Sequence, residues 1–131
     1  MTQPAPSHLP SLAPLRLGQM EVWALHDGRL SLEASLLRGI DPAETRQRLG
    51  GQDAALTPVN AFLLRVNGKT VLVDTGMGKA QGEDSGHLPE QLEAAGVRAG
   101  DIDLVLITHY HFDHIGGLLG SDGTRAFPRA Q

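Results

Sequence analysis

The chain has 131 residues, enough for one domain with a buried hydrophobic core. Its net charge of -4 leaves no excess of positive charge to bind a nucleic-acid backbone, so we expect no nucleic-acid partner. The absence of cysteine excludes disulfides, thiolate nucleophiles and cysteine-ligated metals. No apolar run approaches the roughly 18 residues of a membrane span, and no signal peptide is visible, so we expect a cytoplasmic protein without membrane contact.

Four of the first 14 residues are prolines, which predicts a flexible or polyproline-like leader over residues 1–14. The domain is expected to fill residues 15–131. Strand-forming residues between positions 15 and 25 predict one strand or a bent pair of strands. His26, Asp27 and Gly28 are expected to close that segment as a turn.

A short surface helix is expected next. Asp41 is suited to cap it, Pro42 to occupy its first position, and Glu44 to complete the cap, while Gly50 and Gly51 provide a stop.

The clearest local signal is a β-hairpin. Residues 59–66 and 69–74 are rich in strand formers, and Asn67-Gly68 between them suits a two-residue turn. The apolar residues in both arms are continuous and do not alternate, which predicts that both faces of the sheet are covered.

A strand, helix, strand order follows from the rest of the chain. Pro89 opens a helix with Leu88, Leu92 and Ala95 on one stripe, and Gly96 suits its C-terminal cap. The apolar residues 104–107 predict a buried strand. This order is typical of an α/β or α+β layered domain.

The pattern H-x-H-x-D-H directly after that strand points to metal chemistry. Residues two apart on an extended or looped backbone point to the same side, so His109 and His111 can share one cation, and imidazole nitrogens suit zinc. Asp113 and His114 can face a second cation where the loop turns into a helix. Two adjacent metals can hold a hydroxide between them. A structural histidine cluster or a tag remnant is disfavoured by the interspersed Asp and the Gly-Gly that follows.

The other ionisable residues receive simpler interpretations. Asp74, at the end of a central strand, is expected either to cap its own loop or also to support the metal ligands. His26 and His87 are expected to be solvated rather than ligating. Glu90 and Glu93 are expected on the solvent-exposed face of their helix. His8 lies in the leader and receives no role.

At these residues the sequence resembles the metallo-β-lactamase superfamily, in particular the branch of lactone-opening quorum-quenching enzymes and methyl parathion hydrolase. The resemblance covers residues 15–131 and implies an α+β fold, an αββα sandwich with a dinuclear metal site. It implies His109 and His111 as ligands of one metal, Asp113 and His114 as ligands of the other, zinc as the commonest ion, and iron or manganese as alternatives. It also implies hydrolysis of an ester, lactone, amide or phosphoester of a small-molecule substrate by a metal-bound hydroxide, with Asp113 orienting the water or carrying its proton. Asp74 takes a supporting role.

The sequence departs from the family in its length. The family's remaining ligands, two histidines and an aspartate, lie well downstream of the signature, whereas the 17 residues after His114 contain no histidine and one acid, Asp122. We therefore expect only the N-terminal half of the sandwich, with one apolar face that needs a cover: a second copy of the chain, a separate C-terminal half, or the leader. The rival hypothesis is a truncated, non-catalytic half-domain that acts only in metal binding or assembly. A di-iron oxygen- or NO-reducing protein is disfavoured because no flavin domain is visible.

Overall fold

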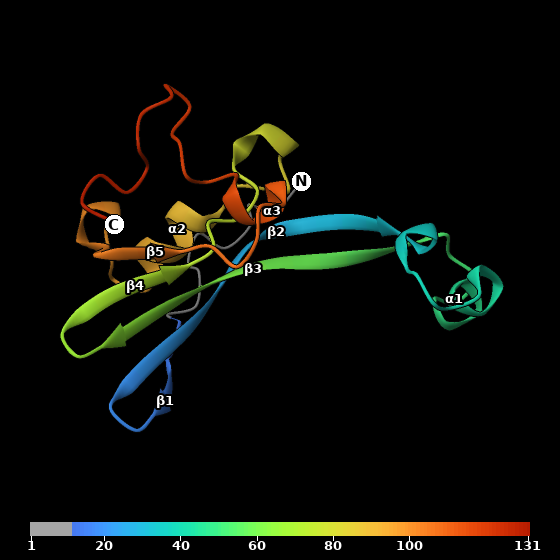
Figure 1. The fold of residues 1–131 in the computed structure, drawn as a ribbon, viewed down its shortest axis with the longest axis horizontal. Coiled ribbons are helices and arrows are strands. Elements are labelled where there is room, and N and C mark those ends of the chain that lie inside the picture. The colour runs from blue at the N-terminus through green and yellow to red at the C-terminus, as the bar shows by residue number, and fades with distance from the viewer. Residues whose placement is uncertain (1–11) are drawn as a thin grey trace, which may run out of the picture.

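A computed structural model describes residues 12–131, which form a five-stranded sheet with helices on one side and a long projecting arm (Figure 1). The strands, in the order in which they lie side by side, are β1 (Leu15–Leu17), β2 (Met20–Glu33), β3 (Ala54–Val66), β4 (Lys69–Val73) and β5 (Leu104–Leu106). The α-helices are α1 (Pro42–Arg48), α2 (Leu88–Ala94) and α3 (Phe112–Ile115), and short 3-10 helices span Ala34–Leu36, Lys79–Gln81 and Ala99–Asp101.

The predicted bent pair of strands is confirmed as β1 and β2, which pair antiparallel. The turn predicted at residues 26–28 is wrong, because β2 continues through these residues to Glu33. The pairing with β3 passes from His26 opposite Asn60 to Gly28 opposite Val59, so Asp27 is the extra residue of a β-bulge. The side chain of Asp27 points into the protein and is fully buried. Asp and Gly, which are typical of turns, here bend a strand without reversing it.

Beyond the bulge, β2 and β3 form an arm that carries α1 at its far end (Figure 1). The predicted helix cap is confirmed: the Asp41 carboxylate accepts hydrogen bonds from the backbone N–H groups of Ala43 at 2.7 Å and Glu44 at 3.4 Å. On the surface of α1, Arg48 pairs with Glu44 at 2.7 Å one helical turn away.

The hairpin between β3 and β4 is confirmed. Val66 pairs with Lys69, and Asn67 and Gly68 between them have φ angles of 50° and 71°. Both angles are in the left-handed region that a type I′ turn requires, which explains why the Asn-Gly pair fixes the register of these strands.

The hydrophobic core lies between the sheet and α2. Leu88 and Leu92 of α2 are 2% exposed, as the predicted stripe requires, and Gly96 after the helix has φ 73°. β4 and β5 run parallel on either side of this helix in the chain, which confirms the strand, helix, strand order. The buried core residues are Trp23, Leu25, Ala61, Leu63, Leu72, Leu88, Leu92, Val97, Ile102 and Phe127.

The opposite face of the sheet is uncovered in the described part of the chain. Along β3, buried Ala61 and Leu63 alternate with Phe62, which is 42% exposed. In β5, Leu106 is 48% exposed. The prediction that both faces are covered, and that residues 104–107 form a buried strand, is therefore wrong for residues 12–131. The apolar residues of these strands were correctly identified, but only one of their two faces meets a helix.

The predicted leader lies outside the described residues except for positions 12–14. There, the indole Nε1–H of Trp23 donates a hydrogen bond to the Leu12 carbonyl at 3.2 Å. No helix within residues 12–131 has the length and apolar character needed to cross a bilayer.

Candidate metal centre

The H-x-H-x-D-H residues lie just beyond the carboxyl ends of β4 and β5. Because these strands are parallel, the residues that follow them meet at one edge of the sheet. Asp74 follows β4 and takes a left-handed backbone conformation with φ 62°, while its N–H donates to the Leu106 carbonyl of β5 at 2.8 Å. Thr108 and His109 follow β5, and His111 stands at the N-terminus of α3.

The first predicted pair of ligands converges. Nε2 of His109 lies 3.1 Å from Nδ1 of His111, and both side chains are exposed. Two nitrogens bound to one tetrahedral zinc at 2.0 to 2.1 Å would lie about 3.3 Å apart. The nitrogen pair therefore fits one edge of a tetrahedral zinc site.

The second predicted pair converges in the same way. Oδ2 of Asp113 lies 3.3 Å from Nε2 of His114. The rings of His109 and His114 are neighbours, with centroids 4.0 Å apart, so the two pairs adjoin each other. A carboxylate oxygen and an imidazole nitrogen form a donor pair that suits zinc or iron.

Neither pair acquires a third donor from the described residues. Within residues 12–131, no three His, Asp or Glu side chains gather closely enough to hold one ion. Asp122, the one acid after the signature, accepts hydrogen bonds from the N–H and the hydroxyl of Thr124, at 3.0 and 2.7 Å, in an exposed loop. It therefore completes a local turn, and each ligand pair has two protein donors in the part of the chain that the structure describes.

Asp74 both caps its loop and contacts a predicted ligand. Its Oδ1 accepts the Thr108 N–H at 2.8 Å, and its Oδ2 accepts the Thr108 hydroxyl at 2.8 Å and lies 2.7 Å from Nδ1 of His114. A proton on Nδ1 leaves Nε2 of His114 with the lone pair that a metal needs. Asp74 therefore caps its loop and contacts His114, and its support of a metal ligand stays a prediction.

The electrostatic balance at Asp74 favours its charged form. Burial by itself would raise the pKa of Asp74, but the hydrogen bonds from Thr108 and His114 and the charge of His114 outweigh it. The net effect is a pKa below the usual value of an aspartate. Asp74 therefore remains an acceptor towards Nδ1 of His114 across the neutral pH range.

The remaining histidines and the two helix glutamates lie away from this centre. His26 is exposed on β2, with Nδ1 3.4 Å from Oδ1 of Asn60, and His87 contacts the Glu83 carbonyl. Glu90 and Glu93 are exposed on α2, as predicted. His8 lies outside the described residues.

The sequence interpretation missed the role of Asp27. Its carboxylate accepts N–H groups of Met77 at 2.8 Å, Leu88 at 3.0 Å and Gly86 at 3.3 Å. A signal was present, since Trp23, Leu25 and Asp27 follow one another with the period of two that places residues on one face of a strand. Asp27 therefore continues the buried face of β2.

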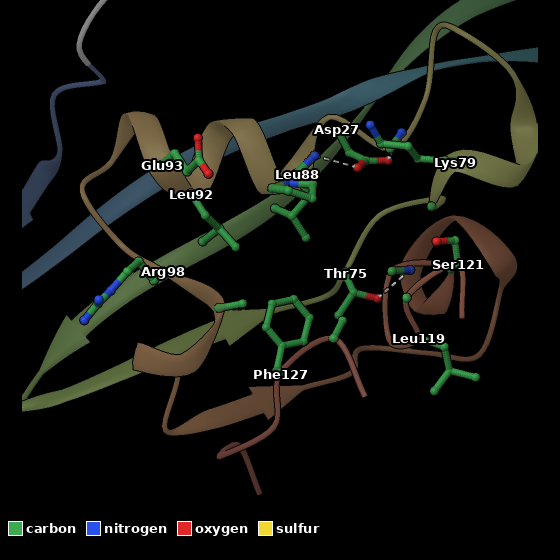
Figure 2. Close-up of a pocket in the computed structure, with 18 of the residues that line it drawn as sticks. Asp27, Thr75, Lys79, Leu88, Leu92, Glu93, Arg98, Leu119, Ser121 and Phe127 are labelled. Atoms are coloured by element: carbon green, nitrogen blue, oxygen red, sulfur yellow. Dashed lines mark hydrogen bonds between the residues drawn. The ribbon is translucent and has the colours of Figure 1, made fainter. Parts of the chain in front are cut away.

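A cavity of about 710 Å³ lies on the helix side of the sheet (Figure 2). Leu88, Leu92 and Phe127 supply apolar walls, and Gly116 and Gly117, which follow α3, also line the cavity. Its lining includes none of the four predicted ligands, so the candidate centre lies outside the cavity.

Residues 54–129, more than half of the chain, match the family model described as "Metallo-beta-lactamase superfamily". The chain belongs to this superfamily.

Two solved superfamily structures resemble the whole described fold. A hydrolase, AbOPH, described as in the beta lactamase superfamily, has a TM-score of 0.82, 26% identity, and coverage of 95% of this chain and 44% of its own. AidC, a dizinc quorum-quenching lactonase, has a TM-score of 0.80 and 31% identity over 92% of this chain and 43% of its own. These neighbours confirm the predicted α+β metallo-β-lactamase fold, of which this chain covers about half.

Curated superfamily relatives match a shorter stretch. The lactamase-like protein adaB of Aspergillus niger is 39% identical over 72 residues, which are 53% of this chain and 21% of adaB. Ribonuclease Z of Streptomyces coelicolor is 38% identical over 61 residues, 47% of this chain and 17% of that enzyme. The chain thus spans less than half the length of these relatives and solved neighbours.

Proposed function

We propose that this chain provides the N-terminal half of a dinuclear metallohydrolase that cleaves an ester, lactone, amide or phosphoester bond of a small molecule. The observation that carries the proposal is the pair of donor separations, 3.1 Å between His109 and His111 and 3.3 Å between Asp113 and His114. Both separations match neighbouring ligands of a small divalent cation. Membership of a superfamily whose solved members include a dizinc lactonase supports the same function.

The four predicted ligands are assigned to two ion sites. His109 and His111 would hold the first ion, and Asp113 and His114 the second, with zinc as the expected occupant and iron or manganese as alternatives. When bound, such ions lower the pKa of coordinated water to about 7 and polarise the bond to be cleaved. With a proton on Nδ1 of His114, 2.7 Å from Asp74, the Nε2 lone pair would be available to the second ion. The second oxygen of Asp113 is left to orient the attacking water or accept its proton.

The substrate class rests on likeness and charge. The superfamily relatives include a lactonase and a ribonuclease, so family membership alone leaves the substrate open. A chain with a net charge of -4 is poorly suited to attract an RNA backbone, and we therefore favour a small molecule. The 31% identity to AidC favours a lactone as the first substrate to test.

The proposal is tested by cobalt binding followed by hydrolysis. We expect Co²⁺ to give visible absorption bands with the chain, and the double variant His109→Ala/His111→Ala to lose the bands of the first site. His26→Ala is the matched control, because His26 is an exposed histidine outside the centre, and it should keep them. Bands of equal strength in the double variant, or none in the unaltered chain, would refute the assigned ligands.

The hydrolysis assay then uses a lactone, a β-lactam and a phosphotriester. Cleavage that EDTA abolishes and Asp113→Asn reduces at least about 100-fold supports the enzymatic function.

A second candidate function is a non-catalytic half-domain that binds metal or assembles with a partner. Two observations favour it: within residues 12–131 each pair lacks a third protein donor, and Phe62 and Leu106 leave an apolar sheet face exposed. The cover is either a second copy of the chain or a separate C-terminal half. Cobalt binding without hydrolysis of any of the three substrates favours this candidate. Sizing chromatography then distinguishes a dimer from a monomer.

A further inference from the structure

The bulge in β2 places a carboxylate in an unusual position. Asp27 opposes no residue of β3, and its side chain is fully buried. Three backbone N–H groups are its side-chain hydrogen-bond donors among the described residues, from Met77, Gly86 and Leu88. A buried carboxylate is costly unless its oxygens are satisfied, and these bonds meet that need. They also tie one point of β2 to both ends of the glycine-rich loop between β4 and α2.

The loop segment at residues 75–78 lies between Asp27 and the C-terminal end of α3, with close backbone contacts on both sides. On one side, a Cβ added to Gly76 would overlap the carboxylate of Asp27. On the other side, a Cβ added to Gly116 would overlap the carbonyl oxygen of Met77, and one added to Gly78 would overlap the carbonyl of Gly116. The Met77 residue therefore donates its N–H to Asp27 while its carbonyl packs against the end of α3. A side chain at Gly76 would push the loop segment away from Asp27, and one at Gly78 or Gly116 would push it away from the end of α3.

The same segment holds α3 by direct hydrogen bonds. The N–H and the hydroxyl of Thr75 both donate to the carbonyl of His114, at 2.8 and 3.0 Å. The Gly116 N–H donates to the Gly76 carbonyl at 2.9 Å, and the Gly117 N–H to the Thr75 hydroxyl at 3.2 Å. Figure 2 shows two bonds of this chain of contacts as dashed lines, one at Asp27 and one at Thr75. Asp27 thus contacts the segment at residues 75–78, and that segment in turn holds the backbone around Asp113 and His114.

We propose that Asp27 is a positioning residue of the second metal site. By fixing residues 75–78 against α3, it sets the 3.3 Å separation between the Asp113 carboxylate and the His114 imidazole. His109 and His111 lie on the loop after β5, and Thr108 in that loop is held by Asp74. The first site should therefore depend less on Asp27 than the second. This inference rests on the proposed function for its metal, and on the contacts above for its geometry.

The test compares Asp27→Asn with Asp84→Asn in the full chain. Both substitutions remove one negative charge, and Asp84 belongs to the same glycine-rich loop, but its exposed side chain pairs with Arg29 at the surface. Asparagine at position 27 keeps the shape but places an N–H₂ group against backbone donors, so it loses part of the anchor. Titration with Co²⁺ is followed by paramagnetic shifts of the ring protons of His109, His111 and His114.

We expect Asp27→Asn to raise the Co²⁺ concentration for half-saturation at His114 at least tenfold. At His109 and His111 the same variant should raise it less than threefold. Asp84→Asn should leave the half-saturation concentration unchanged at all three histidines. Equal weakening at all three histidines, or no weakening, would overturn the positioning role.

Amide hydrogen exchange gives a readout that needs no metal. In the metal-free Asp27→Asn chain, the amides of Thr75 and Gly116 should exchange at least tenfold faster, while those of Leu63 and Leu72 in the sheet keep their protection. Loss of protection throughout the sheet would overturn the proposal, because Asp27 would then support the whole fold rather than this site. An unaltered chain that binds no Co²⁺ refutes the proposed function alone, and the exchange rates of Thr75 and Gly116 then decide the positioning of α3.

Discussion

Oδ2 of Asp74 and Nδ1 of His114 lie 2.7 Å apart although 40 positions separate them in the chain. The contact joins the end of β4 to α3, and the Thr108 hydroxyl shares the same carboxylate oxygen. It couples the stability of this edge of the sheet to the orientation of a predicted ligand.

The substitution Asp74→Asn should destabilise the metal-free chain. Asparagine keeps one carbonyl oxygen but replaces the other acceptor with a donor, so a bond from Thr108 or His114 is lost. Loss of a hydrogen bond to a charged acceptor costs about 2 kcal/mol. Urea unfolding in the presence of EDTA measures the change. His26→Ala, at an exposed histidine outside the centre, is the control and should lie within about 0.5 kcal/mol of the unaltered chain.

The lowered pKa of Asp74 gives this contribution a defined pH dependence. A carboxylate whose pKa is lower in the folded than in the unfolded state stabilises the fold above its unfolded pKa, about 3.9, and loses that effect as pH falls through the folded value. The free energy of unfolding of the unaltered chain should therefore fall more steeply than that of Asp74→Asn as the pH is lowered below about 4. Parallel curves in EDTA for the two proteins would contradict the assignment.

Close backbone packing makes Gly116 sensitive to any side chain. In Gly116→Ala the new Cβ would overlap the Met77 carbonyl, so the loop or α3 must shift. Overpacking of this kind costs about 1 to 3 kcal/mol. Gly100→Ala is the control, because a Cβ at Gly100 meets nothing within 4 Å and the residue lies in a short helix. Equal unfolding midpoints for the two variants would show that α3 does not pack against the loop as described.

The two faces of β3 should respond differently to substitution. Leu63 is fully buried, and Leu63→Ala should cost about 2 to 5 kcal/mol. Phe62, its neighbour in sequence, is 42% exposed on the uncovered face, and Phe62→Ser should cost under about 1 kcal/mol in the isolated chain. Urea unfolding at low protein concentration measures both changes in the free energy of unfolding. A large cost at Phe62 would mean that this face is covered in solution.

Removal of that apolar side chain should also reduce self-association. Light scattering at increasing concentration should rise less for Phe62→Ser than for the unaltered chain, since exposed apolar sheet promotes association. Thr57→Ser is a suitable control because Thr57 lies on the same strand in the arm.

Local signals in the sequence were enough to predict several elements. Asn67 and Gly68 require a particular backbone conformation, and the hairpin follows from that. The cap at Asp41 acts over a few residues, and so does the grouping of donors from His109 to His114. These features depend on near neighbours in the chain, and they are visible without knowledge of the fold.

Features that depend on distant partners were not predictable in the same way. Asp27 and Gly28 have the composition of a turn, and only the loop packed against them, 50 or more positions away, shows that the strand continues. The exposure of Leu106 depends equally on what lies over the sheet. The residue types indicate that a side chain is apolar, while its burial is decided by segments remote in the chain.

The bulge at Asp27 sets which face of the arm each later residue of β2 presents. Because one extra residue interrupts the alternation of β2, residues 29–33 present the opposite faces from those that uninterrupted pairing would give. Removal of Asp27 alone would restore regular alternation and leave residues 29–33 opposite the same residues of β3, on the same faces as now. The extra residue therefore gives β2 two successive buried positions, Asp27 and Gly28, without changing how the arm leads to α1.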